Sequence, residues 1–205
     1  MKRKTKQAIK RTAIVSIAIC GLLLILSVMS TDSQHGRSNL GTPAVSQQVR
    51  DYQPLIEKYA DKYEIAEHVD VLMAMMMQES SGRGNDPMQA SESYCGSRGC
   101  IDDPELSIKQ GVHYFSETLE KADGELRLAV QSYNFGKGFI DYVDMNSETY
   151  TQEAAINFSR EMYAQAEDQS VFRCPRDEAK AIDACYGDIY YVRDVMAYTK
   201  AVAEK

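Results

Sequence analysis

Residues 71–89 read VLMAMMMQESSGRGNDPMQ, an apolar stretch that runs into a polar loop. Leu72, Met75 and Met76 recur at helical spacing, and Glu79 follows on the same stripe of the predicted helix. A carboxylate on the buried side of a helix end is desolvated in its charged form. Its pKa then rises toward the range that a general acid needs. A solvated, helix-ending Glu is the alternative, and this stretch by itself leaves both open.

Charge is distributed unevenly along the 205 residues. The first 30 contain six Lys or Arg residues and no acidic residue, which leaves 17 of the 23 basic residues against all 30 acidic residues elsewhere, a balance of −13. So acidic a region is unsuited to nucleic acid, whose binding depends on neutralisation of phosphates by Lys and Arg. A hydrophobic content of 44% at this length predicts a single domain with a substantial core.

The N-terminal region carries a membrane signal. Residues 13–29 contain no charged side chain and follow a basic segment at residues 1–12. This length lies between a typical signal-peptide core and a spanning helix, and no clear small-x-small cleavage site follows. We therefore favour a retained transmembrane signal anchor over a cleaved one. Residues 1–12 are then cytoplasmic, and residues 30–47, rich in Ser, Gln, Asn and Gly, form a flexible linker outside the cell membrane.

Helical periodicity dominates the region from residue 48 to residue 205. No run alternates convincingly enough to predict a strand, so the fold class expected is all-α, with roughly seven helices and one long loop after residue 82. At that loop's end, Asp103 is suited to cap a helix that begins with Pro104. The apolar stripes that define these helices lie at residues 49–63, 71–79, 108–119, 126–133, 140–143, 154–162 and 191–198.

Four cysteines lie in the region expected outside the membrane, where disulfides form readily. Three pairings are open to them, and proximity in the sequence favours Cys95 with Cys100 and Cys174 with Cys185. A zinc site is the less favoured alternative, because no CxxC pair occurs and the three histidines are scattered. We expect neither a metal nor an organic cofactor.

A second carboxylate follows Glu79 in the loop. Glycoside hydrolysis uses one protonated carboxylic acid and usually a second carboxylate that activates water or stabilises the charged transition state. Asp86 lies seven residues after Glu79, beyond a glycine-rich turn, and is the better candidate, with Glu92 in reserve. A turn-forming Asp that binds its own backbone is the alternative, and the two are left open.

The order and spacing of a known family are found in five segments of the chain: QESSG (78–82), DPMQASES (86–93), SIKQGVHYF (107–115), YNFGKGFIDYV (133–143) and YGDIYYVRDVMAY (186–198). The chain resembles the lysozyme-like, CwlT-type muramidase domain of Gram-positive cell-wall hydrolases, which is related to goose-type lysozymes and soluble lytic transglycosylases. The short cytoplasmic end, single anchor and lone domain resemble small members such as pneumococcal vaccine antigen A.

The resemblance implies cleavage of peptidoglycan glycan strands between N-acetylmuramic acid and N-acetylglucosamine. It implies that Glu79 is the catalytic acid and Asp86 the second carboxylate. From its own chemistry Tyr133 is equally suited to a core position, and the motif places it across the cleft from the acid instead. The substrate-binding residues implied by the family motifs are Ser80, Met88, Gln89, Tyr133 and Asn134.

Three functions remain open. A second carboxylate favours capture of the reacting sugar by water, so we predict a muramidase that hydrolyses its substrate. The first alternative is a lytic transglycosylase, in which the muramoyl 6-hydroxyl gives a 1,6-anhydromuramic end. The second is a non-cutting, membrane-anchored glycan-binding or scaffold protein of the division or secretion machinery. In each case the domain at residues 48–205 faces the wall from the outer side of the cell membrane.

Overall fold

The computed structural model describes residues 44–146, 149–174 and 176–204. The predicted cytoplasmic segment, the anchor at residues 13–29 and most of the linker lie outside these ranges. Within them, no helix combines the length and the apolar character that crossing a membrane requires.

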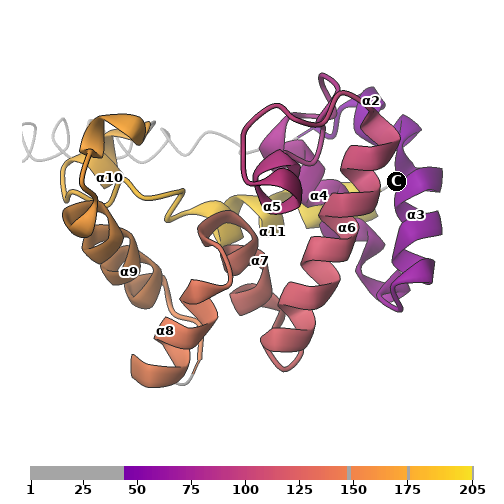
Figure 1. The fold of residues 1–205 in the computed structure, drawn as a ribbon. Coiled ribbons are helices and arrows are strands. Elements are labelled where there is room, and N and C mark those ends of the chain that lie inside the picture. The colour runs from indigo at the N-terminus through magenta and orange to yellow at the C-terminus, as the bar shows by residue number, and fades with distance from the viewer. Residues whose placement is uncertain (1–43, 147–148, 175, 205) are drawn as a thin grey trace, which may run out of the picture. The chain divides into compact units, whose positions relative to one another are not determined.

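All regular structure in the described ranges is helical, which confirms the predicted all-α class for this part of the chain (Figure 1). The seven expected stripes correspond to the longer helices. The first stripe, at residues 49–63, is divided at Tyr52 into α2 and α3. Four or five residues are too few to show a periodicity, so the short helices α5 and α10 were not predicted. The elements are α2 (Gln47–Asp51), α3 (Gln53–Lys62), η1 (Ala66–His68), α4 (Val69–Glu79), α5 (Ser91–Cys95), α6 (Pro104–Lys121), α7 (Leu126–Phe135), α8 (Gly138–Asn146), α9 (Gln152–Gln165), η2 (Gln169–Val171), α10 (Asp177–Lys180) and α11 (Tyr191–Ala203).

Helix α4 is the centre of the core. Every residue from 71 to 77 is buried, including Met73, Ala74 and Met77, which lie off the apolar stripe expected from the sequence. A helix that is apolar on all sides belongs in the interior. α4 packs most extensively on α11 and also contacts α2 and α3. Figure 1 shows α8, α9 and α10 gathered on the other side of α7.

The long loop between α4 and α6 is held at both ends. After α4 the chain turns through Gly82 and Gly84, both with positive φ, and a Cβ on Gly82 would approach the backbone nitrogen of Val49 to 3.0 Å. At the other end Asp103 caps α6 by accepting a hydrogen bond from the Leu106 backbone at 2.9 Å, as expected. These turns return the loop to the end of α4.

Two disulfides close two separate loops. Cys95 is bonded to Cys100, and Cys174 to Cys185, so the pairing favoured by sequence proximity is confirmed. The first closes the loop after α5. The second joins the segment before α10 to the segment before α11.

Gly111 allows α6 to approach the loop closely. A Cβ at this position would lie 2.6 Å from the Met88 Cβ and 2.9 Å from the Tyr133 hydroxyl oxygen. Both distances are shorter than a van der Waals contact, and Met88 is wholly buried. A residue larger than Gly would therefore push the loop away from α6.

We predict that Gly111→Ala destabilises the fold by about 1–3 kcal/mol, because overpacking outweighs the gain in helix propensity, which is about 1 kcal/mol. Chemical denaturation of the purified chain measures the effect. Gly138→Ala in α8 is the matched control, since no atom lies within 4 Å of its added Cβ. Equal stability of the two variants would contradict close packing at Gly111.

Candidate active site

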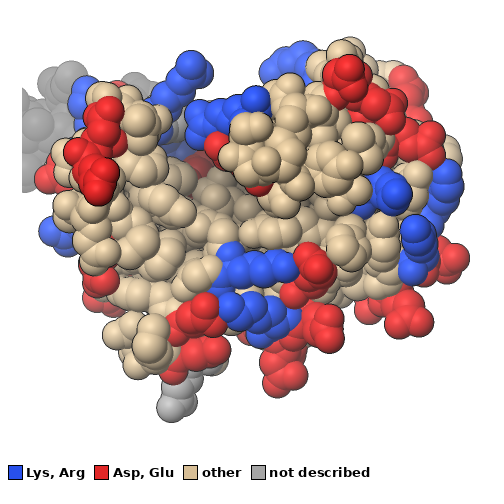
Figure 2. All heavy atoms as spheres, in the orientation of Figure 1, with Lys and Arg blue, Asp and Glu red and all other residues tan. Residues whose placement is uncertain are grey.

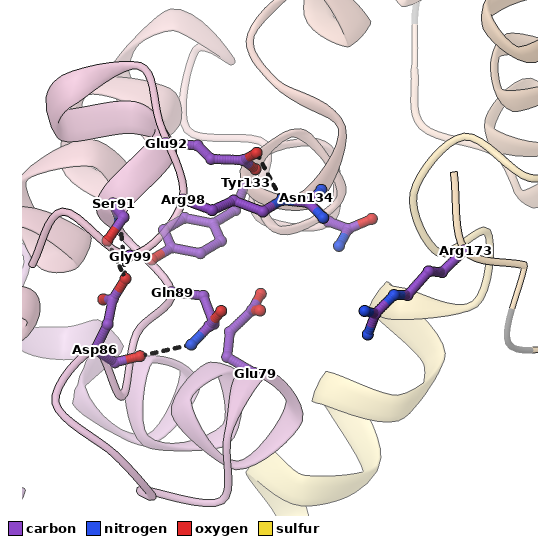
Figure 3. Close-up of a pocket in the computed structure, with 10 residues that line it drawn as sticks. All are labelled: Glu79, Asp86, Gln89, Ser91, Glu92, Arg98, Gly99, Tyr133, Asn134 and Arg173. Atoms are coloured by element: carbon purple, nitrogen blue, oxygen red, sulfur yellow. Dashed lines mark hydrogen bonds and ion pairs between the residues drawn. The ribbon is translucent and has the colours of Figure 1, made fainter. Parts of the chain in front are cut away.

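A pocket of about 430 Å³ opens at the C-terminal end of α4 (Figure 3). Its walls come from the end of α4, the loop that follows, α7 and the segment before α10. The pocket brings Glu79 together with four other residues that the sequence predicted for the site. The lining residues are Glu79, Asp86, Gln89, Tyr133 and Asn134 of the expected set, with Ser91, Glu92, Arg98, Gly99 and Arg173.

Glu79 is the last residue of α4, and its carboxyl faces the pocket. Its pKa is raised from the ordinary value of 4.5 to about 7, chiefly by burial and to a smaller extent by the nearby charges of Asp86 and Asp188. A hydrogen bond from the Tyr191 hydroxyl to Oε1, 2.6 Å long, opposes this rise because it stabilises the charged form. A pKa of about 7 leaves a large protonated fraction at neutral pH, as a general acid requires.

Asp86 is held by four hydrogen bonds. Oδ1 accepts from the Ala90 backbone at 2.8 Å and from the Ser107 hydroxyl at 2.6 Å. Oδ2 accepts from the Ser91 backbone at 3.0 Å and from the Ser91 hydroxyl at 2.6 Å. A carboxylate has about four acceptor positions, so these donors occupy them all. Asp86 therefore ties its own loop to α6, as in the turn-forming alternative, while its charge still acts on Glu79.

Two of the residues assigned to substrate binding do not line this pocket. Met88 has no exposed surface, because its side chain packs beneath Gly111, so the expected cleft-lining role is wrong for its side chain. Ser80 donates its hydroxyl hydrogen to the Pro87 carbonyl at 2.7 Å and accepts from the Gly82 backbone at 3.0 Å. Both residues shape the loop and do not project into the cleft.

Gln89 lies in the pocket as expected. Its backbone has a φ of +50°, an uncommon conformation for a residue other than Gly. Its side-chain nitrogen donates to the Asp86 carbonyl at 2.8 Å, which fixes the amide at the edge of the pocket (Figure 3).

Tyr133 and Asn134 come from the last turn of α7 and face the α4 side of the pocket, as the YNFG motif implied. The Tyr133 hydroxyl donates to the Met88 carbonyl at 2.8 Å, which joins α7 to the loop. Asn134 accepts a hydrogen bond from the Asp188 backbone at 2.7 Å through Oδ1. With its oxygen occupied, the Asn134 amide presents its NH₂ group as a donor toward the pocket.

Asp188 and Tyr191 were not identified as site residues from the sequence. Arg176 forms a two-point contact with Asp188, with Nε 2.8 Å from Oδ1, and also pairs with Asp194. This network holds the Asp188 backbone against Asn134. Asp188 and Tyr191 both lie in the matched YGDIYYVRDVMAY segment. Nothing in that segment indicates that Tyr191 contacts Glu79, because the two residues are 112 positions apart.

A sequence model of the family described as Lysozyme-like matches residues 46–199. The chain belongs to the lysozyme-like family. It is 35% identical over 185 residues to the "Bifunctional muramidase/DL-endopeptidase CwlT" of Bacillus subtilis (strain 168), covering 87% of this chain and 52% of CwlT. The predicted family resemblance is thereby confirmed.

Two other relatives extend the comparison of this lysozyme-like chain. It is 33% identical over 211 residues to the "Uncharacterized membrane protein YocA" of B. subtilis (strain 168), covering the whole of this chain and 93% of YocA. A crystal structure described as similar to lipoprotein, NLP/P60 family, from Staphylococcus aureus superposes with a TM-score of 0.65 at 37% identity, covering 76% of this chain and 54% of that one. The chain thus spans about half the length of CwlT and nearly all of YocA.

We predict that Tyr191→Phe raises the Glu79 pKa by up to about one unit, because it removes a donor that stabilises the carboxylate. Carbon-13 NMR titration of the Glu79 carboxyl measures the change. Tyr190→Phe is the control, since the Tyr190 hydroxyl makes no hydrogen bond to Glu79. A Glu79 pKa that falls or stays constant in Tyr191→Phe would refute this role for the hydroxyl.

Proposed function

We propose that the chain cleaves peptidoglycan glycan strands between N-acetylmuramic acid and N-acetylglucosamine, with Glu79 as general acid. The observation that carries this proposal is the Glu79 carboxyl, whose pKa of about 7 is set by burial at the wall of an open pocket. Membership of the lysozyme-like family and the similarity to a muramidase, CwlT, support the choice of substrate.

In the proposed reaction Glu79 donates its proton to the glycosidic oxygen as the bond from that oxygen to the muramoyl C1 breaks. Positive charge develops on the sugar ring, and the fixed negative charge of Asp86 stabilises it. The NH₂ group of Asn134 and the Gln89 amide are placed to bind acetamido or hydroxyl groups of the sugars. Capture of C1 by water completes hydrolysis.

Asp86 also supports a second candidate, lytic transglycosylation. Its four acceptor positions are occupied by the donors described above, which leaves none to deprotonate a water molecule. The muramoyl 6-hydroxyl would then capture C1 and form an anhydro ring. Hydrolysis remains the first proposal, with Asp86 acting through its charge and the water activated by the Glu79 carboxylate once it has lost its proton.

For this role of Asp86 we predict that Asp86→Asn lowers the cleavage rate at least about tenfold, since it removes the charge. Ser107→Ala, which leaves the charge and frees one acceptor position, is expected to change the rate much less. Mass spectrometry of digested peptidoglycan then identifies the product. Reducing muramic acid ends support hydrolysis, whereas anhydromuramic ends alone would assign transglycosylation.

Glu79→Gln tests the proposal as a whole. We expect the purified full chain with this change to lose solubilisation of cell walls, and the active protein to lose activity as pH rises through about 7, where its acid deprotonates. Because the pKa of Glu79 is raised in the folded protein, ionisation of this carboxyl destabilises the fold progressively as pH rises from 4.5 to about 7. At pH 8 we therefore expect Glu79→Gln to unfold at a temperature equal to or higher than that of the unsubstituted protein. Retained wall solubilisation would refute the enzymatic function.

The proposed site of action is the outer side of the cell membrane. YocA is named as a membrane protein and aligns with the whole of this chain. We infer a cytoplasmic segment at residues 1–12, an anchor at 13–29, a linker at 30–47 and a catalytic domain at 48–205. If Glu79→Gln abolishes wall solubilisation but still complements a deletion, the physiological role is that of a scaffold for the division or secretion machinery.

A further inference from the structure

Two arginines reach the pocket from opposite sides (Figure 3). Arg98 lies inside the loop closed by the Cys95–Cys100 disulfide, and Arg173 directly precedes Cys174, which is bonded to Cys185. Lys or Arg side chains are visible on both sides of the hollow at its upper edge, while acidic side chains spread over the outer surfaces (Figure 2). Basic residues at this cleft are unexpected in so acidic a domain.

The two arginines differ in their partners. Nε of Arg98 lies 2.8 Å from the Glu92 carboxylate, and both side chains are largely exposed. In the described ranges of the chain no carboxylate pairs with Arg173, which is exposed at the pocket wall. Arg176, three residues later, by contrast forms ion pairs with Asp188 and Asp194.

The acidic groups of the pocket do not compensate the charge of Arg173. Asp86 already accepts four hydrogen bonds, and Glu92 pairs with Arg98. Glu79 is substantially protonated near neutral pH, because burial raises its pKa to about 7. Arg173 therefore presents a guanidinium that is free to bind an anion.

Arg173 is carried by a well-supported segment. The neighbouring Phe172 ring packs against Tyr163 and Tyr186, with centroid separations of 6.0 and 5.5 Å. The Cys174–Cys185 disulfide ties the other side of Arg173 to the segment before α11. A recognition group on a constrained segment loses less conformational entropy on binding, which favours affinity.

A planar guanidinium binds a carboxylate through two parallel hydrogen bonds. The N-acetylated sugars of the glycan are uncharged, and the lactyl carboxyl of each substituted muramic acid is consumed in its amide bond to the peptide. In glycan that carries no teichoic acid phosphates, the anions nearest the scissile bond are thus the carboxylates of the peptide stem. We propose that Arg173 binds a peptide-stem carboxylate and makes the domain selective for peptide-substituted glycan; this inference rests on the proposed function.

The test compares two substrates that differ only in charge: peptidoglycan freed of teichoic acid, and the same material with its carboxyl groups amidated. On the unmodified substrate we expect Arg173→Gln to lower kcat/KM of the full chain roughly tenfold. On the amidated substrate we expect Arg173→Gln to match the unsubstituted protein. Arg160→Gln, an equal charge change on the exposed side of α9 and away from the pocket, is the control and is expected to leave both rates unchanged.

Three outcomes would overturn the inference: no loss on either substrate, an equal loss on both, or a loss seen only with walls that retain teichoic acid phosphates. Sedimentation with the same two substrates, using Glu79→Gln with and without Arg173→Gln, measures binding without cleavage. If the unsubstituted protein cuts neither substrate, the proposed function fails. The binding comparison still decides the role of Arg173, since only a carboxylate contact makes its effect depend on amidation.

Discussion

Desolvation of the Glu79 carboxyl is the constraint on which the pocket depends. α4 carries this carboxyl to the interior because the helix is apolar on every side and packs closely on α11. A buried carboxyl is most stable when neutral, and this preference raises its pKa to about 7. Tyr191 on α11 then donates a hydrogen bond that orients the group and limits the rise. The apolar character of α4 therefore determines both the packing of the core and the raised pKa of Glu79.

The loop after α4 is positioned by Asp86 and by the absence of a side chain at Gly111. Asp86 collects donors from its own loop and from Ser107 on α6, while Gly111 leaves room for Met88 and the Tyr133 hydroxyl. The residues of the DPMQ motif thus have different roles. Asp86 and Met88 hold the loop, and Gln89 is left to face the pocket. The four hydrogen bonds to Asp86 also affect whether water or a sugar hydroxyl completes the proposed reaction, because they occupy the acceptor positions that would deprotonate water.

The wall opposite Asp86 is built by the C-terminal third of the chain. The Arg176–Asp188 contact holds the Asp188 backbone where it orients Asn134, so that this amide offers a donor to the pocket. The Cys174–Cys185 disulfide joins the segment that carries Arg173 to the segment that leads to Asp188. Arg173 emerges from the same segment, and no carboxylate of the described residues pairs with it, so the support of this wall also positions the side chain proposed to bind the substrate.

Local patterns in the sequence predicted the all-α class and the Asp103 cap, favoured the two disulfide pairings that the structure shows, and placed Glu79 on the apolar stripe of its helix while leaving open whether it is buried. Each of these depends on residues close together in the chain, through helical periodicity, capping or short loop closure. The hydrogen bond from Tyr191 to Glu79, the burial of Met88 and the occupied acceptors of Asp86 were decided by the tertiary structure. They arise where α11, α6 and the loop pack together, and no sequence spacing encodes a contact between side chains 112 residues apart.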